Sequence, residues 1–227
     1  MNAEVKGQAQ APGAALPGSQ AERFLAIRRM TRSLTAPLSA EDCAIQSMPD
    51  ASPVKWHLAH TTWFFETFVL AAHLPGYQVF DPSFRVLFNS YYHSVGERHP
   101  RLERGMLTRP DLAQVLTYRA QVEQAMLDLL GGAPLPPELA AIVELGLHHE
   151  QQHQELILTD AKHLLSRNPL KPAYQDKWPL TPIHACARRW LGFAEGLHQI
   201  GHAGTDFCFD NETPRHAVRL LPFALGN

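Results

Sequence analysis

The sequence contains few cysteines, no excess of positive charge and no long apolar run. Its three cysteines, Cys43, Cys186 and Cys208, are far apart and odd in number, which argues against a disulfide framework and favours a reducing cytoplasm. With 20 lysines and arginines against 22 acidic residues, the chain lacks the positive charge of a general nucleic-acid binder. No apolar run reaches the roughly 18–20 residues of a membrane span, and the N-terminus lacks a signal-peptide pattern. We therefore expect a cytoplasmic protein that binds neither nucleic acid nor membrane.

Histidine, by contrast, is abundant, with 13 residues in a chain of 227. Imidazole is the commonest metal ligand in proteins and the side chain that titrates near neutral pH. The number alone identifies no site, because most single histidines lie on the surface or form hydrogen bonds in the core. Their spacing within predicted helices is the more informative observation.

The apolar periodicity predicts a mainly α-helical protein. Residues 1–19 consist mostly of Ala, Gly, Pro and Gln without an apolar face, which indicates a disordered leader. Long helical patterns follow, and together they predict a helical bundle over residues 20–170. These patterns cover about 21–35, 53–74, 111–130 and 137–167.

The second helix and the connection after it have local signals of their own. Ser52 stands before Pro53, which predicts a serine N-cap with proline in the first helical position. Residues 77–109 are rich in aromatic and turn-forming residues. We predict a long connection there that is partly helical, with a helix over Phe84–Val95.

The sequence changes character after residue 170, where Pro, Trp and Gly become frequent. Short alternating runs between Gly196 and Leu225 predict short strands and loops. We expect a linker over 171–195 and a second domain that starts at 196. The roughly 30–40 residues up to 227 are too few to bury an independent core, so we expect only the beginning of that domain in this chain.

His149 and His153 are four residues apart within a predicted helix. Positions i and i+4 point in nearly the same direction, so the two imidazoles can bind one metal ion. Solvated polar residues on an amphipathic helix are the alternative. We favour the metal pair because the apolar Leu145 and Leu156 lie near the same predicted face.

The third ligand must come from another helix, and His60 is the best candidate. It lies on the same predicted helix face as Trp56 and Trp63, which would direct it toward the core. Three neutral imidazoles leave the +2 charge of a metal uncompensated and favour an anionic ligand such as a thiolate. Zinc and iron both fit this donor set, and the residues alone do not distinguish them.

The same segment also matches H-E-x-x-H, the signature of zinc proteases. In that interpretation Glu150 would act as the general base. The motif is short, however, and Glu155 stands where a protease helix usually has an apolar residue. No convincing third ligand follows it, so we consider a protease the weaker hypothesis.

Several motifs in order resemble the ergothioneine-biosynthesis sulfoxide synthases (EgtB). They are Trp56-His-Leu-Ala-His60, Phe88-Asn-Ser-Tyr-Tyr92, Arg101-Leu-Glu-Arg-Gly105, Thr108-Arg-Pro110 and His149-Glu-Gln-Gln-His153. The resemblance implies a DinB-like four-helix bundle. Phe207-x-Phe-Asp-Asn-Glu-x-Pro-x-His216 resembles the start of the α+β domain that follows in that family, which is of the formylglycine-generating-enzyme (C-type-lectin-like) type.

The resemblance implies an Fe(II)- and O2-dependent oxidoreductase. Such an enzyme joins the sulfur of γ-glutamylcysteine or cysteine to hercynine and oxidises the sulfur to a sulfoxide. The family's iron ligands fall on His60, His149 and His153, and Gln152 falls where a family residue lies close to the substrates. Arg101 and Arg104 resemble the family's clamp for the carboxylates of the thiol substrate, with a solvated basic turn as the alternative. Asn89 and Tyr92 are candidate substrate-binding residues on the pocket wall, and packing of the aromatic connection explains them equally well.

In the family, the C-terminal domain completes the pocket and supplies a tyrosine proton donor. We therefore expect residues 1–227 to bind iron but to catalyse the reaction poorly or not at all without the rest of that domain. Other functions remain open: a zinc-dependent thiol transferase or isomerase on the same bundle, a non-catalytic iron- or thiol-binding module, or a synthase of 5-histidylcysteine sulfoxide on the ovothiol route.

Overall fold

The computed structural model describes residues 18–176 and 186–227. The chain divides into two compact units, one up to Gln175 and one from Asp176. Most of the leader predicted over 1–19 and the middle of the linker predicted over 171–195 lie outside the described residues.

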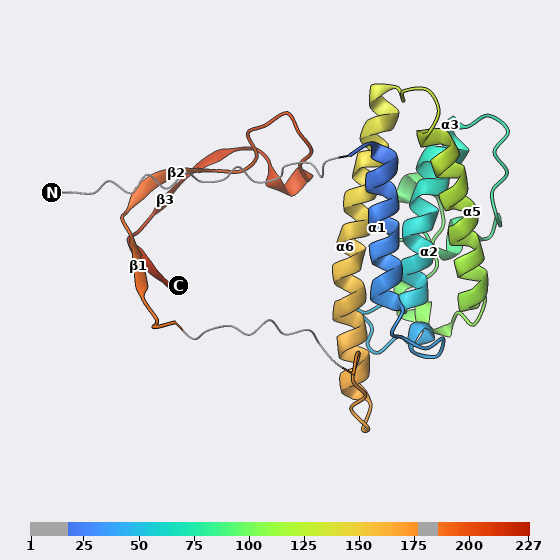
Figure 1. The fold of residues 1–227 in the computed structure, drawn as a ribbon, viewed down its shortest axis with the longest axis horizontal. Helices are drawn as coiled ribbons and strands as arrows, with labels where there is room; N and C mark the ends of the chain where they lie inside the picture. Colours follow the sequence, from blue (N-terminus) through green and yellow to red (C-terminus); the bar gives the residue numbers. More distant parts are fainter. Residues whose placement is uncertain (1–17, 177–185) are drawn as a thin grey trace. The chain divides into compact units, whose positions relative to one another are not determined.

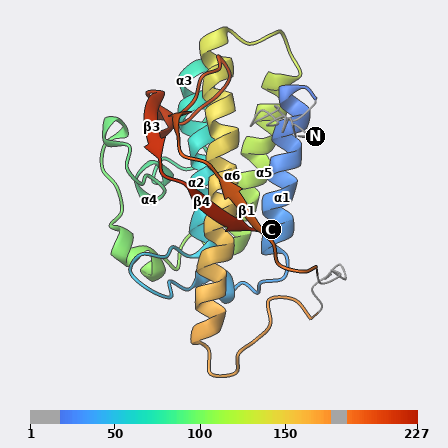
Figure 2. The same ribbon diagram turned by 90° about the vertical axis from the view of Figure 1, so that its left-hand side faces the viewer.

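Four long helices form the first unit: α1 (Gln20–Thr35), α2 (Val54–Phe65), α5 (Leu112–Leu130) and α6 (Pro137–Arg167). They lie side by side as a bundle (Figures 1 and 2). Helix α6 packs against α1 and α2, and α2 also packs against α5. The mainly α-helical fold expected from the sequence is confirmed, and α6 has the predicted bounds.

Side-chain caps define where α1 and α5 begin. At α1, the Glu22 backbone N–H donates to Ser19 Oγ at 3.2 Å, and the Ser19 N–H donates back to the Glu22 carboxylate at 2.7 Å. Asp111 and Gln114 form the same reciprocal pair at α5. These capping boxes satisfy backbone donors that the first helical turn leaves unpaired.

Helix α2 begins differently from the prediction. Pro53 occupies the N-cap position, and Ser52 lies outside the helix without capping it. The Ser52 hydroxyl instead accepts a hydrogen bond from Arg104 at 2.9 Å. Serine here is therefore held by tertiary partners, which outweigh its local capping preference.

The helical path of α2 continues through a π-helical turn, η2 (Glu66–Leu70), into the short α3 (Ala71–His73). The buried Glu66 carboxylate accepts from the Tyr118 hydroxyl at 2.7 Å, the Tyr77 hydroxyl at 3.1 Å and the Phe80 N–H at 2.9 Å. This carboxylate therefore ties the turn to α5 and to the start of the following connection.

The connection contains three short helical pieces: α4 (Phe84–Leu87), η3 (His93–Val95) and η4 (Arg101–Met106). The helix predicted over Phe84–Val95 is therefore wrong in its second half. The Asn89 side-chain amide donates to the carbonyls of Tyr92, Gly96 and Glu97 at 3.2–3.3 Å. Such bonds offer the backbone an alternative to helical pairing, which explains the end of α4.

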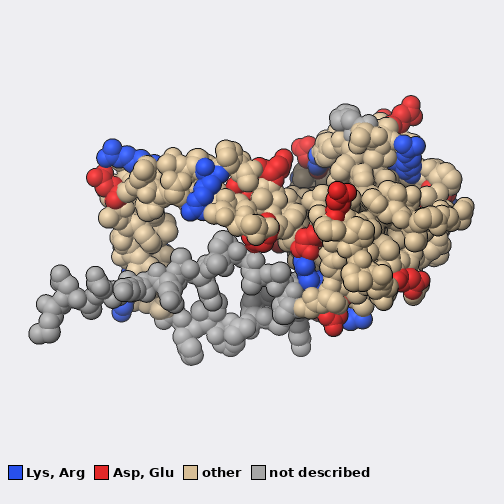
Figure 3. Space-filling view, turned by 90° about the horizontal axis from the view of Figure 1, so that it is seen from above, with Lys and Arg blue, Asp and Glu red and all other residues tan. Residues whose placement is uncertain are grey.

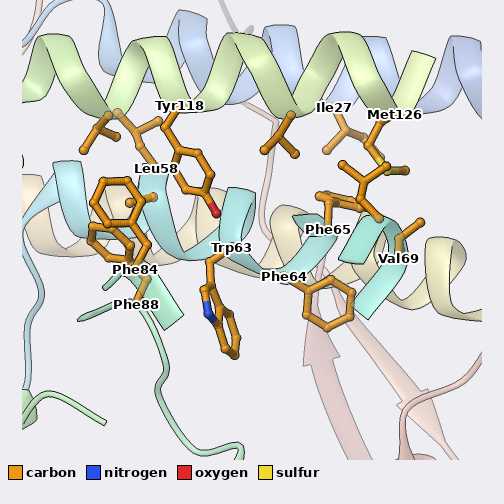
Figure 4. Packing of buried hydrophobic residues seen from close by; sticks show 14 of the residues in the cluster. Ile27, Leu58, Trp63, Phe64, Phe65, Val69, Phe84, Phe88, Tyr118 and Met126 are labelled. Carbon is orange, nitrogen blue, oxygen red and sulfur yellow. The ribbon is translucent and has the colours of Figure 1, made fainter. Parts of the chain in front are cut away.

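Helix α2 occupies the centre of the core, and all its residues are buried. A helix buried on every side needs no polar stripe, in contrast to amphipathic α1 and α6. Figure 4 shows Trp63 and Phe65 of α2 among the buried side chains of the core, together with Tyr118 and Met126 of α5. Helix α2 is therefore the central helix of the bundle, and α5 and α6 both pack against it.

Helices α2 and α6 approach closely at Gly146. An added Cβ there would lie 2.6 Å from Phe65 Cε1 and 2.9 Å from Phe64 Cε1. Gly146→Ala should therefore lower the free energy of unfolding by about 1–3 kcal/mol through overpacking, although alanine is the better helix former. Denaturant unfolding measures the change, with Ala141→Gly as the control for helix propensity at an exposed position of α6. A more stable Gly146→Ala variant would contradict the close approach.

The second unit contains two antiparallel ribbons. Strand β1 (Trp190–Phe193) pairs with β4 (Phe223–Gly226), and β2 (Gly196–Ile200) pairs with β3 (His216–Leu220). Most residues of these strands are exposed, including large apolar ones such as Trp190 and Leu197. Strands β2, β3 and β4 agree with the alternating pattern predicted from Gly196 onward, whereas β1 lies within the predicted linker over 171–195.

The described helices include none that is long and apolar enough to cross a membrane. On the face seen in Figure 3, acidic and basic side chains of the described residues are scattered without an extended patch of one sign. This distribution agrees with the nearly balanced composition of 20 basic and 22 acidic residues.

Candidate metal centre

Helices α2 and α6 bring His60, His149 and His153 together. One nitrogen of each imidazole lies within 4.8 Å of those of the other two. His60 Nε2 and His149 Nε2 are 3.2 Å apart, and the ring centroids of the three histidines are 4.6–4.9 Å apart. Such convergence from two helices is the geometry that a shared metal ion requires.

Burial keeps these imidazoles neutral. It is the main cause that lowers the pKa of His60 and His153 well below the ordinary value, and each is lowered further by its histidine neighbours. Burial also lowers the pKa of His149 to about 4. Near neutral pH all three rings are uncharged, so their lone pairs are available to a cation.

His60 is held in one orientation. Its Nδ1 donates to the Phe88 carbonyl at 2.6 Å, because a carbonyl oxygen can only accept. Its ring stacks against Trp56 at 4.5 Å and against Trp63 at 5.5 Å between centroids. The Nε2 lone pair is therefore directed toward the other two histidines before any ligand arrives.

His149 and His153 lie at the edge of the buried stripe of α6. That stripe contains Leu139, Val143, Leu147 and Ile157. Leu145 and Leu156, expected on the core face, are instead 41% and 40% exposed. The rotation of α6 is set by its packing on α1 and α2, and it places the histidine pair at the border between core and pocket.

The three histidines line a pocket of about 510 Å³. Gln152, Tyr92, Arg101 and Arg104, all predicted site residues, also line it. Asn89 does not, because its buried side chain holds the loop that follows α4. The other lining residues are Asp50, Ser52, Trp56, His57, Ser90, Tyr91, Leu156 and Asp160.

Arg104 is a buried cation at the edge of this pocket. Its guanidinium lies 3.4 Å from the Trp56 ring centroid and donates to Ser52 Oγ at 2.9 Å and Ser90 Oγ at 3.1 Å. Burial and the neighbouring Arg101 lower its pKa to about 10. Among the described residues no carboxylate forms an ion pair with it. A buried, unpaired guanidinium that faces a pocket fits an anionic ligand.

Arg101 lies nearer the solvent than Arg104. Its guanidinium donates to the Tyr91 hydroxyl at 2.8 Å and to the Asp50 carbonyl. Both arginines therefore line the same pocket as the three histidines. A small molecule with a carboxylate could reach both groups.

Two residues beside the centre had no part in the sequence-based predictions. His57 Nδ1 lies 2.8 Å from His153 Nδ1, and His57 Nε2 lies 3.0 Å from Asp160 Oδ2. His57 is one turn before His60 on α2, and Asp160 is two turns after His153 on α6. This helical spacing was the available signal for both residues.

Glu150 does not belong to the pocket. It is fully buried and faces α1 and α5, where it binds Arg28 at 3.0 Å, Arg119, and the Thr31 hydroxyl at 2.7 Å. Burial disfavours its ionisation, but the two guanidiniums prevail and lower its pKa to about 2. A carboxylate used in this way cannot serve as the general base of a zinc protease, so the H-E-x-x-H match is fortuitous.

No curated protein shows a significant match to the sequence. A model described as the DinB superfamily matches residues 23–157, which is more than half of the chain. The matched region begins in α1, ends in α6 and contains all three histidines of the candidate centre. The chain therefore belongs to the DinB superfamily.

Proposed function

We propose that this protein is a non-haem Fe(II)- and O2-dependent sulfoxide synthase of the ergothioneine type. Its substrates would be hercynine and γ-glutamylcysteine or cysteine, joined through sulfur with oxidation to a sulfoxide. The observation that carries the proposal is the pocket itself, which is lined both by three neutral histidines and by a buried arginine without a carboxylate partner among the described residues. The choice of this reaction rests on the sequence motifs, whose order resembles that of the sulfoxide synthases.

The residues present fit a metal ion. Three imidazoles offer nitrogen ligands, and His149 Nδ1 is buried without a hydrogen-bond partner. Since the donor set carries no negative charge, a bound dication would favour an anionic substrate. Iron bound there would supply coordination positions for a thiolate and for O2, while the electrons that reduce O2 would come from the thiol sulfur and the imidazole C–H bond.

The arginines would bind and orient the thiol substrate. Arg104 is fixed by two serine hydroxyls and by Trp56, so it can bind a carboxylate with little loss of side-chain freedom. Arg101 would add a second guanidinium near the entrance. A volume of about 510 Å³ is in the range of small-molecule sites, which suits an amino acid or a dipeptide.

Two polar residues would contact the reacting groups. Gln152 is exposed, lines the pocket and precedes the ligand His153, so its amide can hydrogen-bond a substrate beside the metal. Burial raises the pKa of Tyr92, which therefore stays protonated and can donate a hydrogen bond. Both residues would orient substrates without adding charge to the centre.

We also propose that residues 196–227 begin a formylglycine-generating-enzyme-like domain. The support is the segment Phe207–His216, whose residues resemble the start of that domain, and the exposed apolar side chains of the ribbons. Exposed apolar strands of this kind gain stability when further chain covers them.

The decisive test is the product formed by the full-length protein loaded with Fe(II). Aerobic incubation with hercynine and each thiol should give a product with the mass of the two substrates plus one oxygen and minus two hydrogens, and NMR should locate the new bond on imidazole C2. A bond at C5 would indicate the ovothiol-type reaction. Turnover with zinc in the absence of O2 would indicate a thiol transferase instead and overturn the proposal.

A further inference from the structure

A buried hydrogen-bond relay runs from Asp160 through His57 to His153. The distances are 3.0 Å from Asp160 Oδ2 to His57 Nε2 and 2.8 Å between the Nδ1 atoms of His57 and His153. His57 is 2% exposed and Asp160 9% exposed, so water has little access to these bonds. A fourth histidine beside the three of the centre thus contacts one of them directly.

If the Asp160 carboxylate is ionised and both imidazoles are neutral, only one placement of the protons satisfies both hydrogen bonds of this relay. Asp160 can only accept, so His57 carries its proton on Nε2 and presents a bare Nδ1. That atom can only accept from His153, which must then carry its proton on Nδ1. The lone pair of His153 is left on Nε2, the nitrogen free to bind a metal.

The carboxylate at the far end is itself fixed. The Ser52 backbone N–H donates to the same Asp160 Oδ2 at 2.9 Å. Ser52 Oγ accepts from Arg104, so the serine also contacts the residue proposed to bind substrate. The relay is therefore anchored between the residue before α2 and the C-terminal third of α6.

We propose that His57 is a positioning residue, which together with Asp160 fixes the tautomer and orientation of His153 for metal binding. The inference rests on the proposed function only in taking His153 as a ligand. It is independent of which metal or substrates the centre uses. A partner on the uncoordinated nitrogen of a ligand histidine typically changes metal affinity about 10–100-fold.

The first measurement is the tautomer of His153 in the metal-free, full-length protein, from long-range ¹H–¹⁵N correlation spectra. The wild type should show the proton on Nδ1. His57→Phe keeps an aromatic ring but removes the acceptor, so the His153 tautomers should become mixed. His57→Asn places an amide oxygen near the former Nδ1 and should restore the single tautomer.

The second measurement is Zn(II) affinity by competition with a chelator. His57→Phe and Asp160→Leu should weaken binding about 10–100-fold, whereas His57→Asn and Asp160→Asn should stay within a few-fold of the wild type. The Asp160→Asn amide oxygen can still accept from both Ser52 and His57. His163→Phe is the matched control. His163 is also on α6, but it lies outside the pocket, and its Nδ1 is 2.8 Å from the Ser47 hydroxyl.

An unchanged His153 tautomer and unchanged affinity in His57→Phe would overturn the proposal. Equal loss of affinity in His163→Phe would show a general effect of packing and overturn it as well. If His57→Phe does not fold, His57→Asn and Asp160→Leu still test each half of the relay. Failure of the wild type to bind any metal would reject the proposed function, while the tautomer would still decide the relay.

Discussion

His149→Ala and His153→Ala should each abolish stoichiometric binding of Fe(II) and Zn(II). Each substitution removes one of three nitrogen donors that lie within 4.8 Å of one another. The loss should exceed the roughly 10–100-fold expected for a residue outside the coordination shell. Metal content after dialysis and calorimetric titration with Zn(II) both measure it.

His148→Ala is the matched control for these two variants. His148 precedes His149 on α6 but interacts with Glu144 at 3.1 Å, away from the pocket. This variant should bind metal as the wild type does. Metal content that is unchanged in His149→Ala and His153→Ala would reject the ligand assignment.

Thermal stability offers a second readout of the same substitutions. A ligand present at about 100 times its dissociation constant stabilises the folded state by about 2.7 kcal/mol. Zn(II) should therefore raise the melting temperature of the wild type and of His148→Ala but not that of His149→Ala. A shift in all three proteins would indicate metal bound elsewhere.

The sequence predicted the parts of the centre that depend on local spacing. His149 and His153 follow from the i, i+4 geometry of one helix, and the bounds of α6 follow from prolines near both ends. His60 was inferred from its aromatic helix face, and the structure places it beside the other two. Fold class was equally accessible, because long amphipathic patterns with clear stops leave few alternatives to a bundle.

The sequence did not predict features that depend on contacts between helices. Leu145 and Leu156 were expected on the core face of α6, but packing on α1 and α2 turns the helix so that both are exposed. Asn89 was assigned to the substrate pocket, whereas its amide is used to hold a loop. His57 was missed because its partner Asp160 is 103 positions away in the sequence.

The buried ion cluster around Glu150 also depends on contacts between helices, and its loss should strongly reduce stability. Glu150 is the only acidic group among the described residues that pairs with both Arg28 and Arg119, which belong to α1 and α5. Glu150→Leu would remove the carboxylate partner that the two buried guanidiniums share. Arg28 would keep Glu123, at 3.5 Å. Breaking a buried pair by removal of one partner costs about 3–5 kcal/mol.

Denaturant unfolding at neutral pH should therefore show Glu150→Leu destabilised by about 3–5 kcal/mol. Glu155→Leu, an exposed position on the same helix, should change stability by less than about 0.5 kcal/mol. A small effect of Glu150→Leu would mean that the arginines find other partners and that the cluster does not fix the rotation of α6.

The pH dependence of stability provides an independent check on this cluster. The folded-state pKa of Glu150 is lowered from its ordinary value of 4.5 to about 2, so its contribution to stability is fully present above pH 4.5 and is lost as pH falls toward 2. The wild type should lose stability over this range more steeply than Glu150→Gln, which cannot ionise there. Equal slopes for the two proteins would show that Glu150 is not ionised in the core and would contradict the ion pairs with Arg28 and Arg119.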